Sequence, residues 1–312
     1  MKLLRLVPAN TNIQFIDKRF YAMALSIFLV LGSIGLYTTK GLNLGIDFLG
    51  GIMLEVQTQG PANISDLRSR VSGLGLGDIS LQEFGEPDIV LIRVQRQPGG
   101  DNAQQEAVSK VKGALGDAVV EYRRTELVGP TVGAELQQSA FFAVLAAIGA
   151  ILLYIWFRFE WQFGVGAVIA LGHDVITTIG LFSLFALEFN LSTVAAVLTI
   201  AGYSINDTVV VYDRVRENLR KFKKMPLTEL FNRSINETLS RTVNTSFSTM
   251  LALLVLFLFG GEVIRGFTIA MMWGICIGTY SSIALAVPLL LYLNVHRGAE
   301  DDQSSQTQEA AS

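Results

Sequence analysis

Two aspartates of the sequence lie inside apolar segments that are long enough to cross a membrane. Asp174 interrupts residues 161–187 together with its neighbour His173, and Asp207 interrupts residues 189–212. A carboxylate at the centre of a spanning helix costs about 2.5–3.5 kcal/mol on insertion scales, so such residues face protein or water and mark ion or proton pathways. The chemistry that these two positions indicate is the binding and release of protons.

Polar side chains accompany both carboxylates at helical spacing, where residues three or four apart share a face. Thr177 and Thr178 share the face of Asp174, and Ser204 precedes Asp207 by one turn. We therefore expect the third, fourth and fifth spans to turn polar faces toward a common interior. The stripe of the fifth span comprises Arg241, Asn244, Thr245, Ser248, Thr249 and Ala252.

Asp207 and Arg241 are predicted to form an ion pair in this interior. An aspartate that alternates between an ionised, Arg-paired state and a protonated, unpaired state is an element with two states. One elementary charge crossing 100 mV is worth about 2.3 kcal/mol, so a proton gradient can drive such an element. The alternative is a static pair that fixes helix register.

Asp174 is a second candidate for proton coupling. It lies near the middle of its segment and is deeper in the membrane than Asp207. The alternative is a carboxylate that is simply satisfied by His173 or by a neighbouring threonine. For His173 itself a structural role is favoured over a proton relay.

Six apolar segments position these residues, and a spanning helix needs roughly 20 mostly apolar residues. The composition agrees, because 51% of the residues are hydrophobic and 16% are charged, whereas a soluble domain carries about 25% charged residues. The sequence predicts spans at 20–39, 136–157, 161–187, 189–212, 242–261 and 266–295.

Basic residues near the spans set the orientation, because Lys and Arg accumulate on the cytoplasmic side. They cluster in residues 1–19 and in the predicted cytoplasmic loop 213–241, whereas the opposite short loops hold only Arg265. The N-terminus is therefore expected in the cytoplasm, and six spans return residues 296–312 to the same side. Residues 40–135 form the large outer segment.

The composition excludes two classes of chemistry. The formal net charge is −3, so there is no basic surplus to neutralise a nucleic-acid backbone. The single cysteine, Cys276, has no partner for an intrachain disulfide and no companion for a metal site. We expect no catalytic residues, no metal and no cofactor.

The outer segment has the pattern of a small folded domain. It shows an extended stretch at 45–58, a helix near 64–74, strands near 79–84 and 89–94, a helix near 102–115 and a strand near 119–127. This βαββαβ order predicts a ferredoxin-like antiparallel sheet with both helices on one face. The Pro87-Asp88 step fits the turn of the central hairpin.

The stretch GIDFLGG at 45–51 lies where the first span meets the outer domain. Its glycines, Gly45, Gly50 and Gly51, permit a tight turn or close packing. The alternative is a plain strand entrance in which Asp47 lies near water, so that its charge needs no special explanation.

Five motifs in a fixed order resemble those of a known family. They are GIDFLGG at 45–51, VGPTVGAEL at 128–136, HDV at 173–175, GYSINDTVVVYDRVREN at 202–218 and SRTVNTS at 240–246. With six spans and one outer domain after the first, the sequence resembles the SecF proteins of the SecD/SecF family of bacterial protein-export membrane proteins. These proteins are half-sized relatives of the resistance-nodulation-division (RND) transporters.

The resemblance implies a bacterial inner-membrane protein with a periplasmic outer domain. It implies pairing with SecD, six spans with six, attachment to the SecYEG channel, and YajC and YidC as further partners in a lipid membrane. The implied function is to use the proton-motive force to complete the crossing of a preprotein after the SecA ATPase has acted. Asp207 and Arg241 match the family's proton-pathway Asp and Arg. That pathway adds an Asp of SecD, which this chain does not contain, and the family does not settle the role of Asp174.

Two other functions share parts of the pattern. Half of an RND-type proton-driven solute exporter would share the fold, but the outer domain is much smaller than the porter regions of such exporters. An intramembrane aspartyl protease would also place aspartates on adjacent spans, but its GxGD signature is absent around Asp207, which lies in SIND. We therefore expect a translocation subunit that is not an enzyme.

Overall fold

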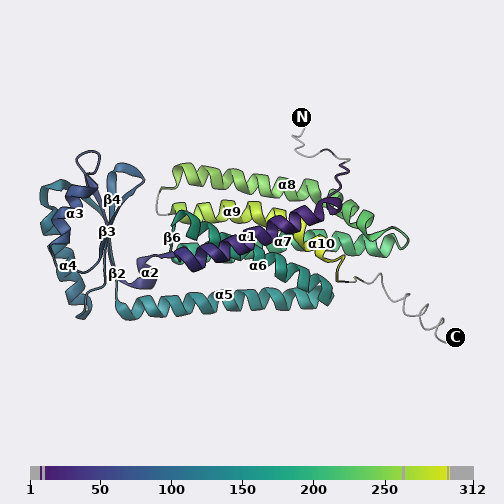
Figure 1. Cartoon of the computed structure of the whole chain (residues 1–312), viewed down its shortest axis with the longest axis horizontal. Helices are drawn as coiled ribbons and strands as arrows, with labels where there is room; N and C mark the ends of the chain where they lie inside the picture. The colour runs from purple at the N-terminus through teal and green to yellow at the C-terminus, as the bar shows by residue number, and fades with distance from the viewer. Residues whose placement is uncertain (1–7, 9–10, 262–263, 294, 296–312) are drawn as a thin grey trace.

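The computed structural model describes residues 8, 11–261, 264–293 and 295. A sheet domain lies at one end of the molecule, and a bundle of long, roughly aligned helices forms the rest (Figure 1). Among the described residues, six helices are long and apolar enough to cross a membrane. The predicted class, a polytopic helical membrane protein with one α+β domain between its first two spans, is confirmed.

The six long helices lie where the sequence is poor in charge. The second of them begins at Pro130 rather than at residue 136, because a proline suits the first turn of a helix, where its missing N–H is not needed. The bounds are α1 (Arg19–Lys40), α5 (Pro130–Arg158), α6 (Trp161–Phe185), α7 (Leu191–Lys221), α8 (Leu227–Phe259) and α9 (Arg265–Ser281).

The segment predicted as a cytoplasmic loop, residues 213–241, is mostly helical. Helix α7 continues to Lys221 and α8 begins at Leu227, so only residues 222–226 lie between them. Charged side chains end an apolar stretch of sequence but do not end a helix. The prediction of a loop rested on hydropathy alone and was wrong for this reason.

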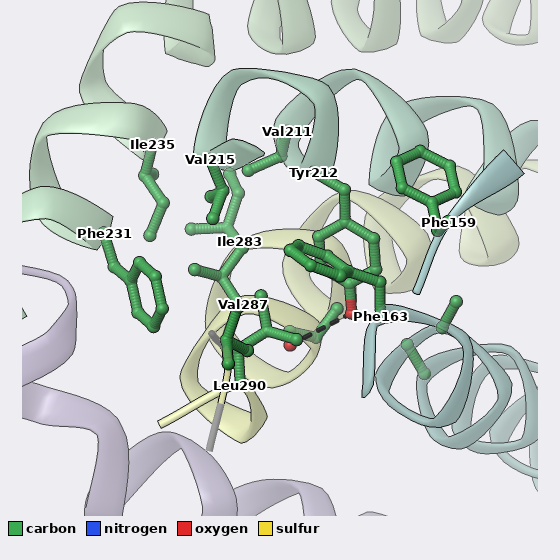
Figure 2. Packing of buried hydrophobic residues seen from close by; sticks show 14 of the residues in the cluster. Phe159, Phe163, Val211, Tyr212, Val215, Phe231, Ile235, Ile283, Val287 and Leu290 are labelled. Carbon is green, nitrogen blue, oxygen red and sulfur yellow. Dashed lines mark hydrogen bonds between the residues drawn. The ribbon is translucent and has the colours of Figure 1, made fainter. Parts of the chain in front are cut away.

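Apolar side chains at helical spacing hold this pair of helices together. Val211 and Val215 of α7 and Phe231 and Ile235 of α8 belong to one buried cluster (Figure 2). Fully burying a side chain of this size contributes about 1.5–3 kcal/mol. In the same cluster, the Tyr212 hydroxyl donates a hydrogen bond of 3.1 Å to a backbone carbonyl at the end of the π-helical turn that follows α9. The packed core therefore continues beyond the apolar parts of α7 and α8.

The last membrane helix ends earlier than the predicted span, 266–295. Helix α9 gives way to a π-helical turn, η4 (Ser282–Ala286), and then to the short α10 (Val287–Leu289). Pro288 has no N–H to donate to a carbonyl of the preceding turn, so the regular hydrogen-bond ladder of α9 cannot continue through it. The predicted tail, 296–312, lies outside the described residues.

The sheet domain has the ferredoxin-like arrangement that the sequence predicts. The sheet is antiparallel and its strand order is β3-β4-β2-β5. The elements are β2 (Gly51–Thr58), α3 (Ile64–Ser72), β3 (Ile79–Phe84), β4 (Glu86–Val94), α4 (Gly100–Leu115), a 3-10 turn η2 (Gly116–Ala118) and β5 (Val119–Val128).

Both helices of the domain cover the face of the sheet that points away from the bundle (Figure 1). Alternate strand residues such as Leu54 and Ile92 pack there against Val71 of α3 and Val111 of α4, and all four are fully buried. The side chains between them in the strands point to the opposite face. That second face is therefore directed toward the membrane helices.

Two local predictions in the domain are wrong. The central hairpin turns at Gly85, whose φ is +79°, whereas Pro87 and Asp88 belong to strand β4. A glycine adopts this left-handed conformation without the steric cost of a Cβ. In addition, residues 46–49 are not extended but form a short helix, α2 (Ile46–Leu49).

Close contacts fix the centre of the bundle, where α7 packs against α6, α8 and α9. A Cβ added at Gly274 of α9 would lie 2.3 Å from Cγ1 of Ile200 of α7, and one at Gly278 would lie 3.1 Å from Cβ of Ser204. These two glycines serve close helix packing, as their spacing predicts. The backbone of α9 is thereby held directly against the face of α7 that carries Ser204.

Candidate proton-coupling site

The Asp174 side chain is fully enclosed at the centre of the bundle, with 0% of its surface exposed. Three polar side chains contact its carboxyl group. Oδ1 lies 2.9 Å from Nδ1 of His173, while Oδ2 accepts hydrogen bonds from Ser204 at 2.5 Å and from Ser281 at 2.8 Å. The carboxylate therefore joins three helices, because Ser204 belongs to α7 and Ser281 to α9.

The threonines that share the face of Asp174 do not reach its carboxylate. The hydroxyls of Thr177 and Thr178 donate to the Asp174 backbone carbonyl, at 3.1 Å and 2.7 Å. The alternative interpretation of Asp174 named His173 or a neighbouring threonine as the partner of its carboxylate. Only His173 contacts the carboxylate. Sequence reasoning missed Ser281 as a partner, although the Ser281-Ser282 pair inside an apolar span was a signal that could have found it.

A second layer of hydroxyls continues this network toward the C-terminal end of α7. Ser282 at the start of the π-turn lies 2.8 Å from the hydroxyl of Thr208. Thr208 also donates to the backbone carbonyl of Ser204, at 3.1 Å. π-turns inside helices are frequent at functional sites. Here the turn presents a serine to the face of α7 that also contacts Asp174.

Asp207 lies one turn beyond Ser204 on α7 and is 6% exposed. Its Oδ1 accepts a hydrogen bond of 2.8 Å from the hydroxyl of Thr242 on α8. Its Oδ2 is buried and has no hydrogen-bond partner among the described residues. The carboxyl group is therefore half-satisfied, and one oxygen is left for a proton or for a partner that the described residues do not supply in this arrangement.

The predicted ion pair between Asp207 and Arg241 is not formed in this structure. Within the part of the chain that the structure describes, no carboxylate lies within 4.0 Å of the Arg241 guanidinium, and the residue is exposed. Successive residues of an α-helix point about 100° apart. This rotation gives the inward position to Thr242 and turns Arg241 outward.

The polar stripe that starts at Arg241 does not face the interior of this chain. Asn244, Thr245 and Ser248 are exposed along α8. One neighbour does turn inward, since the Ser246 hydroxyl accepts from Tyr203 of α7 at 3.3 Å and lies 2.7 Å from that of Thr279. The polar interior is therefore made chiefly by the third, fourth and sixth spans, α6, α7 and α9, and the prediction is wrong for the fifth span, α8.

The GIDFLGG stretch forms a structured junction between the two parts of the molecule. Asp47 of α2 accepts a hydrogen bond of 2.9 Å from the backbone N–H of Leu191 at the first residue of α7. The preceding Asn43 and Leu44 form β1, which pairs in parallel with β6 (Glu188–Phe189). Asp47 thus links α2, at the entrance to the sheet domain, with the start of α7, and the stretch is not a plain strand entrance.

The glycines of this stretch are required by close approach and by backbone conformation. Gly50 and Gly51 have φ values of +70° and +123°, and a Cβ on Gly51 would lie 2.6 Å from the Val94 carbonyl oxygen. A Cβ on Gly45 would lie 2.7 Å from Oε1 of Glu188. Larger residues at these positions would push α2 and β2 away from their neighbours.

We expect Asp47→Ala to loosen the junction. The substitution removes the acceptor at the start of α7, and the loss of a helix cap costs about 0.5–2 kcal/mol. The measurement is the thermal unfolding midpoint of the full chain in detergent, which should fall in Asp47→Ala and stay near wild type in Asp47→Asn. Glu106→Ala, which breaks only an exposed pair with Lys110, is the control. A wild-type midpoint in Asp47→Ala would contradict the capping role.

A cavity of about 450 Å³ lies between the inward face of the sheet and the adjacent end of the bundle. Its walls carry charges of both signs, and Arg93 of the sheet forms an ion pair with Glu188 of the α6–α7 connection. The further charged residues of its lining are Asp47, Glu55, Glu83, Arg124, Glu126 and Arg265.

Comparison with known proteins decides the family. Residues 108–296 match the family model described as protein export membrane protein SecD/SecF, C-terminal, and residues 38–62 match the SecD/SecF GG motif. The chain belongs to the SecD/SecF family. The GG motif of this family is the stretch that forms the junction described above.

Curated SecD/SecF relatives extend over almost the whole chain. The protein translocase subunit SecF of Cereibacter sphaeroides is 45% identical over 96% of this chain and 95% of the relative. That of Rhodobacter capsulatus is 44% identical over 97% of this chain and 95% of the relative. The protein translocase subunit SecDF of Brucella abortus is 43% identical over 92% of this chain but only 38% of its own length.

Solved SecDF structures have the same fold as this chain. One is SecDF of Thermus thermophilus, described as a translocon-associated membrane protein, with a TM-score of 0.84 and 37% identity over 92% of this chain and 39% of that one. A SecDF in a super-membrane-facing form has a TM-score of 0.67 and 36% identity over 98% and 41%. This chain therefore spans about two fifths of the SecDF proteins, whose remaining part it does not contain.

Proposed function

We propose that this chain is the SecF-type subunit of the preprotein translocase, and that it works with a SecD subunit to convert the proton-motive force into the final movement of a preprotein. The observation that carries the proposal is Asp207, a buried carboxyl that holds one hydroxyl partner on a neighbouring helix and has one oxygen without a partner. The overall role follows from relatives that are translocase subunits and that this chain covers almost completely.

In this proposal, the structure corresponds to the unpaired state of a two-state switch. With a proton on its second oxygen, Asp207 is neutral and rests on Thr242. After the proton leaves, the carboxylate needs a cation, because an unpaired charge is costly in a membrane. Arg241 is adjacent to Thr242 in the chain, so a rotation of α8 about its own axis would exchange the hydroxyl for the guanidinium. The exchange changes how α7 and α8 pack.

A SecD subunit is the partner that supplies the rest of the site. Fused SecDF relatives support a permanent pairing of the two halves. The exposed polar stripe of α8 supports it as well, because a membrane helix that shows Arg241, Asn244 and Ser248 on its surface needs protein or water there rather than lipid. We place the SecD helices against this stripe, with one carboxylate of SecD near Arg241.

We place the protein in the bacterial inner membrane, with both termini in the cytoplasm and the sheet domain in the periplasm. The distribution of Lys and Arg supports this orientation. There the domain would contact the emerging preprotein, while the membrane part associates with SecYEG, YajC and YidC. The subunit has no catalytic role of its own. Movement would pass from α7 to the domain through Asp47 and the β1–β6 ladder.

Complementation tests this function directly. Bacterial cells depleted of their own SecF should regain export when they are supplied with this chain together with its SecD partner. Pulse-labelled preprotein should then be processed to its mature form. The same chain should be recovered with SecD after mild solubilisation. Recovery with SecD without any restored export would contradict the proposal.

A further inference from the structure

Asp174 is held in a way that suits an ionised carboxylate rather than a protonated one. An ionised carboxyl group only accepts hydrogen bonds, and this group accepts them from Ser204 and Ser281 while its other oxygen lies 2.9 Å from Nδ1 of His173. Hydrogen bonds donated to the charged form stabilise that form. The two serine hydroxyls converge on one oxygen, which leaves the other oxygen to the imidazole ring alone.

A lone negative charge in this position would be expensive. The side chains of Asp174 and His173 are 0% and 2% exposed, and a buried charge is tolerated only when it is paired. The sole ionisable group within hydrogen-bond distance of the carboxylate, among the described residues, is the His173 ring. We propose that His173 is an imidazolium here, so that the His173–Asp174 pair is a second proton-holding site of this chain, separate from Asp207.

Apart from Asp207, the groups that face this pair from the neighbouring helices do not compete for the proton. Helix α9 brings the Tyr280 ring to 6.0 Å from the His173 ring, but its hydroxyl already donates to the Ala22 carbonyl at 2.7 Å. Helix α7 brings Ser204 and, one turn further, Asp207. The apolar stretches of α1 and α5 carry no charged residue, and η4 adds only the hydroxyl of Ser282.

The far side of the His173 ring is closed in this state, so the proposed proton is exchanged only when the helices move. Its Nε2 is buried and makes no hydrogen bond within the part of the chain that the structure describes. The carboxylate is linked to Asp207 through one turn of α7, because Ser204 binds Asp174 while Asp207 binds Thr242. A shift of α7 that frees Asp207 therefore also pulls a donor away from Asp174 and loosens its hold on the imidazolium.

The protonation state of His173 can be measured without interference. The chain has two histidines, His173 and His296, so a His296→Gln chain gives a single set of imidazole signals. The full chain is assembled with SecD in liposomes, labelled with ring nitrogen-15 and observed by solid-state NMR at about pH 8, where free imidazole is neutral. We expect both ring nitrogens of His173 to carry protons. A neutral ring at this pH overturns the proposal.

Three variants separate the pair from its surroundings. Asp174→Asn should convert His173 to the neutral imidazole. Where that variant does not fold, Ser204→Ala combined with Ser281→Ala should do the same, because it leaves the carboxylate with one donor. Thr177→Val is the matched control, since Thr177 reaches only the backbone carbonyl of Asp174, and it should keep the imidazolium. An unchanged imidazolium in Asp174→Asn would show that Asp174 does not hold the proton, and one in the double variant would show that the two serine hydroxyls do not stabilise the pair.

The role of this site in transport rests on the proposed function, whereas the NMR result does not. His173→Gln should reduce the gradient-dependent part of export while SecA-driven transport stays normal. Unchanged export with an NMR-proven imidazolium would overturn the transport role and leave a static pair. If Asp207→Asn retained full export, the proposed function would fail whatever the state of His173.

Discussion

Asp207→Asn should abolish the gradient-dependent part of preprotein export while leaving assembly intact. The asparagine carbonyl oxygen can still accept the hydrogen bond from Thr242, so the local packing of α7 against α8 is kept. An amide never ionises, so the residue is fixed in the equivalent of the protonated, unpaired state. Export measured by pulse-labelling in cells should fall to the level of cells without the subunit, while recovery with SecD stays unchanged.

Asp213→Asn is the matched control for this variant. It lies on the same helix, but its side chain is 43% exposed and pairs with Arg158 at 2.7 Å. Exposed ion pairs contribute about 0–1 kcal/mol, so its loss should leave export near wild type. Export at the wild-type level in both variants would show that Asp207 is only structural.

Arg241→Lys should reduce gradient-dependent export by about tenfold or more. Lysine keeps the charge but lacks the planar fork that binds a carboxylate through two parallel hydrogen bonds. A hydrogen bond to a charged group is worth about 1.5–3 kcal/mol, and about 1.4 kcal/mol corresponds to a factor of ten. The loss falls on the state in which Asp207 is ionised, because in the state seen here Arg241 forms no ion pair with the described residues.

The matched control for Arg241→Lys is Arg220→Lys, because Arg220 is exposed near the end of α7. Both variants keep net charge, so a difference between them reports the geometry of the cation at residue 241. Wild-type export in Arg241→Lys would favour a purely electrostatic role. Thr242→Ser, which keeps the hydroxyl that binds Asp207, should behave like wild type.

The fold was largely predictable because its main signals are local. Long uncharged stretches located the six helices, and the alternation of helix and strand patterns located the elements of the sheet domain. Errors arose where tertiary packing overrides composition. The charged continuation of α7 remains helical because Val215 and Leu219 are buried against α8, which no hydropathy window reports. The hairpin turn depends on the backbone freedom of Gly85 rather than on Pro87.

Only the two buried carboxylates of the site could be predicted from the sequence. The energy needed to place a carboxylate in a membrane singled out Asp174 and Asp207 from sequence alone. Their partners depend on helix rotation, which spacing within one helix does not determine. A difference of one residue decides whether Thr242 or Arg241 faces Asp207, and Ser281 is brought to Asp174 by the packing of Gly274 and Gly278 against α7.

The most direct test of the central claim is the gradient-driven completion of one preprotein. Inverted inner-membrane vesicles that contain this chain and SecD are allowed to start a SecA-driven crossing, ATP is then removed, and a proton gradient is imposed. Wild-type vesicles should finish the crossing only with the gradient, and an uncoupler should stop it. Vesicles with Asp207→Asn should stall in both conditions. Completion at the same rate in both kinds of vesicle would contradict proton coupling through this chain.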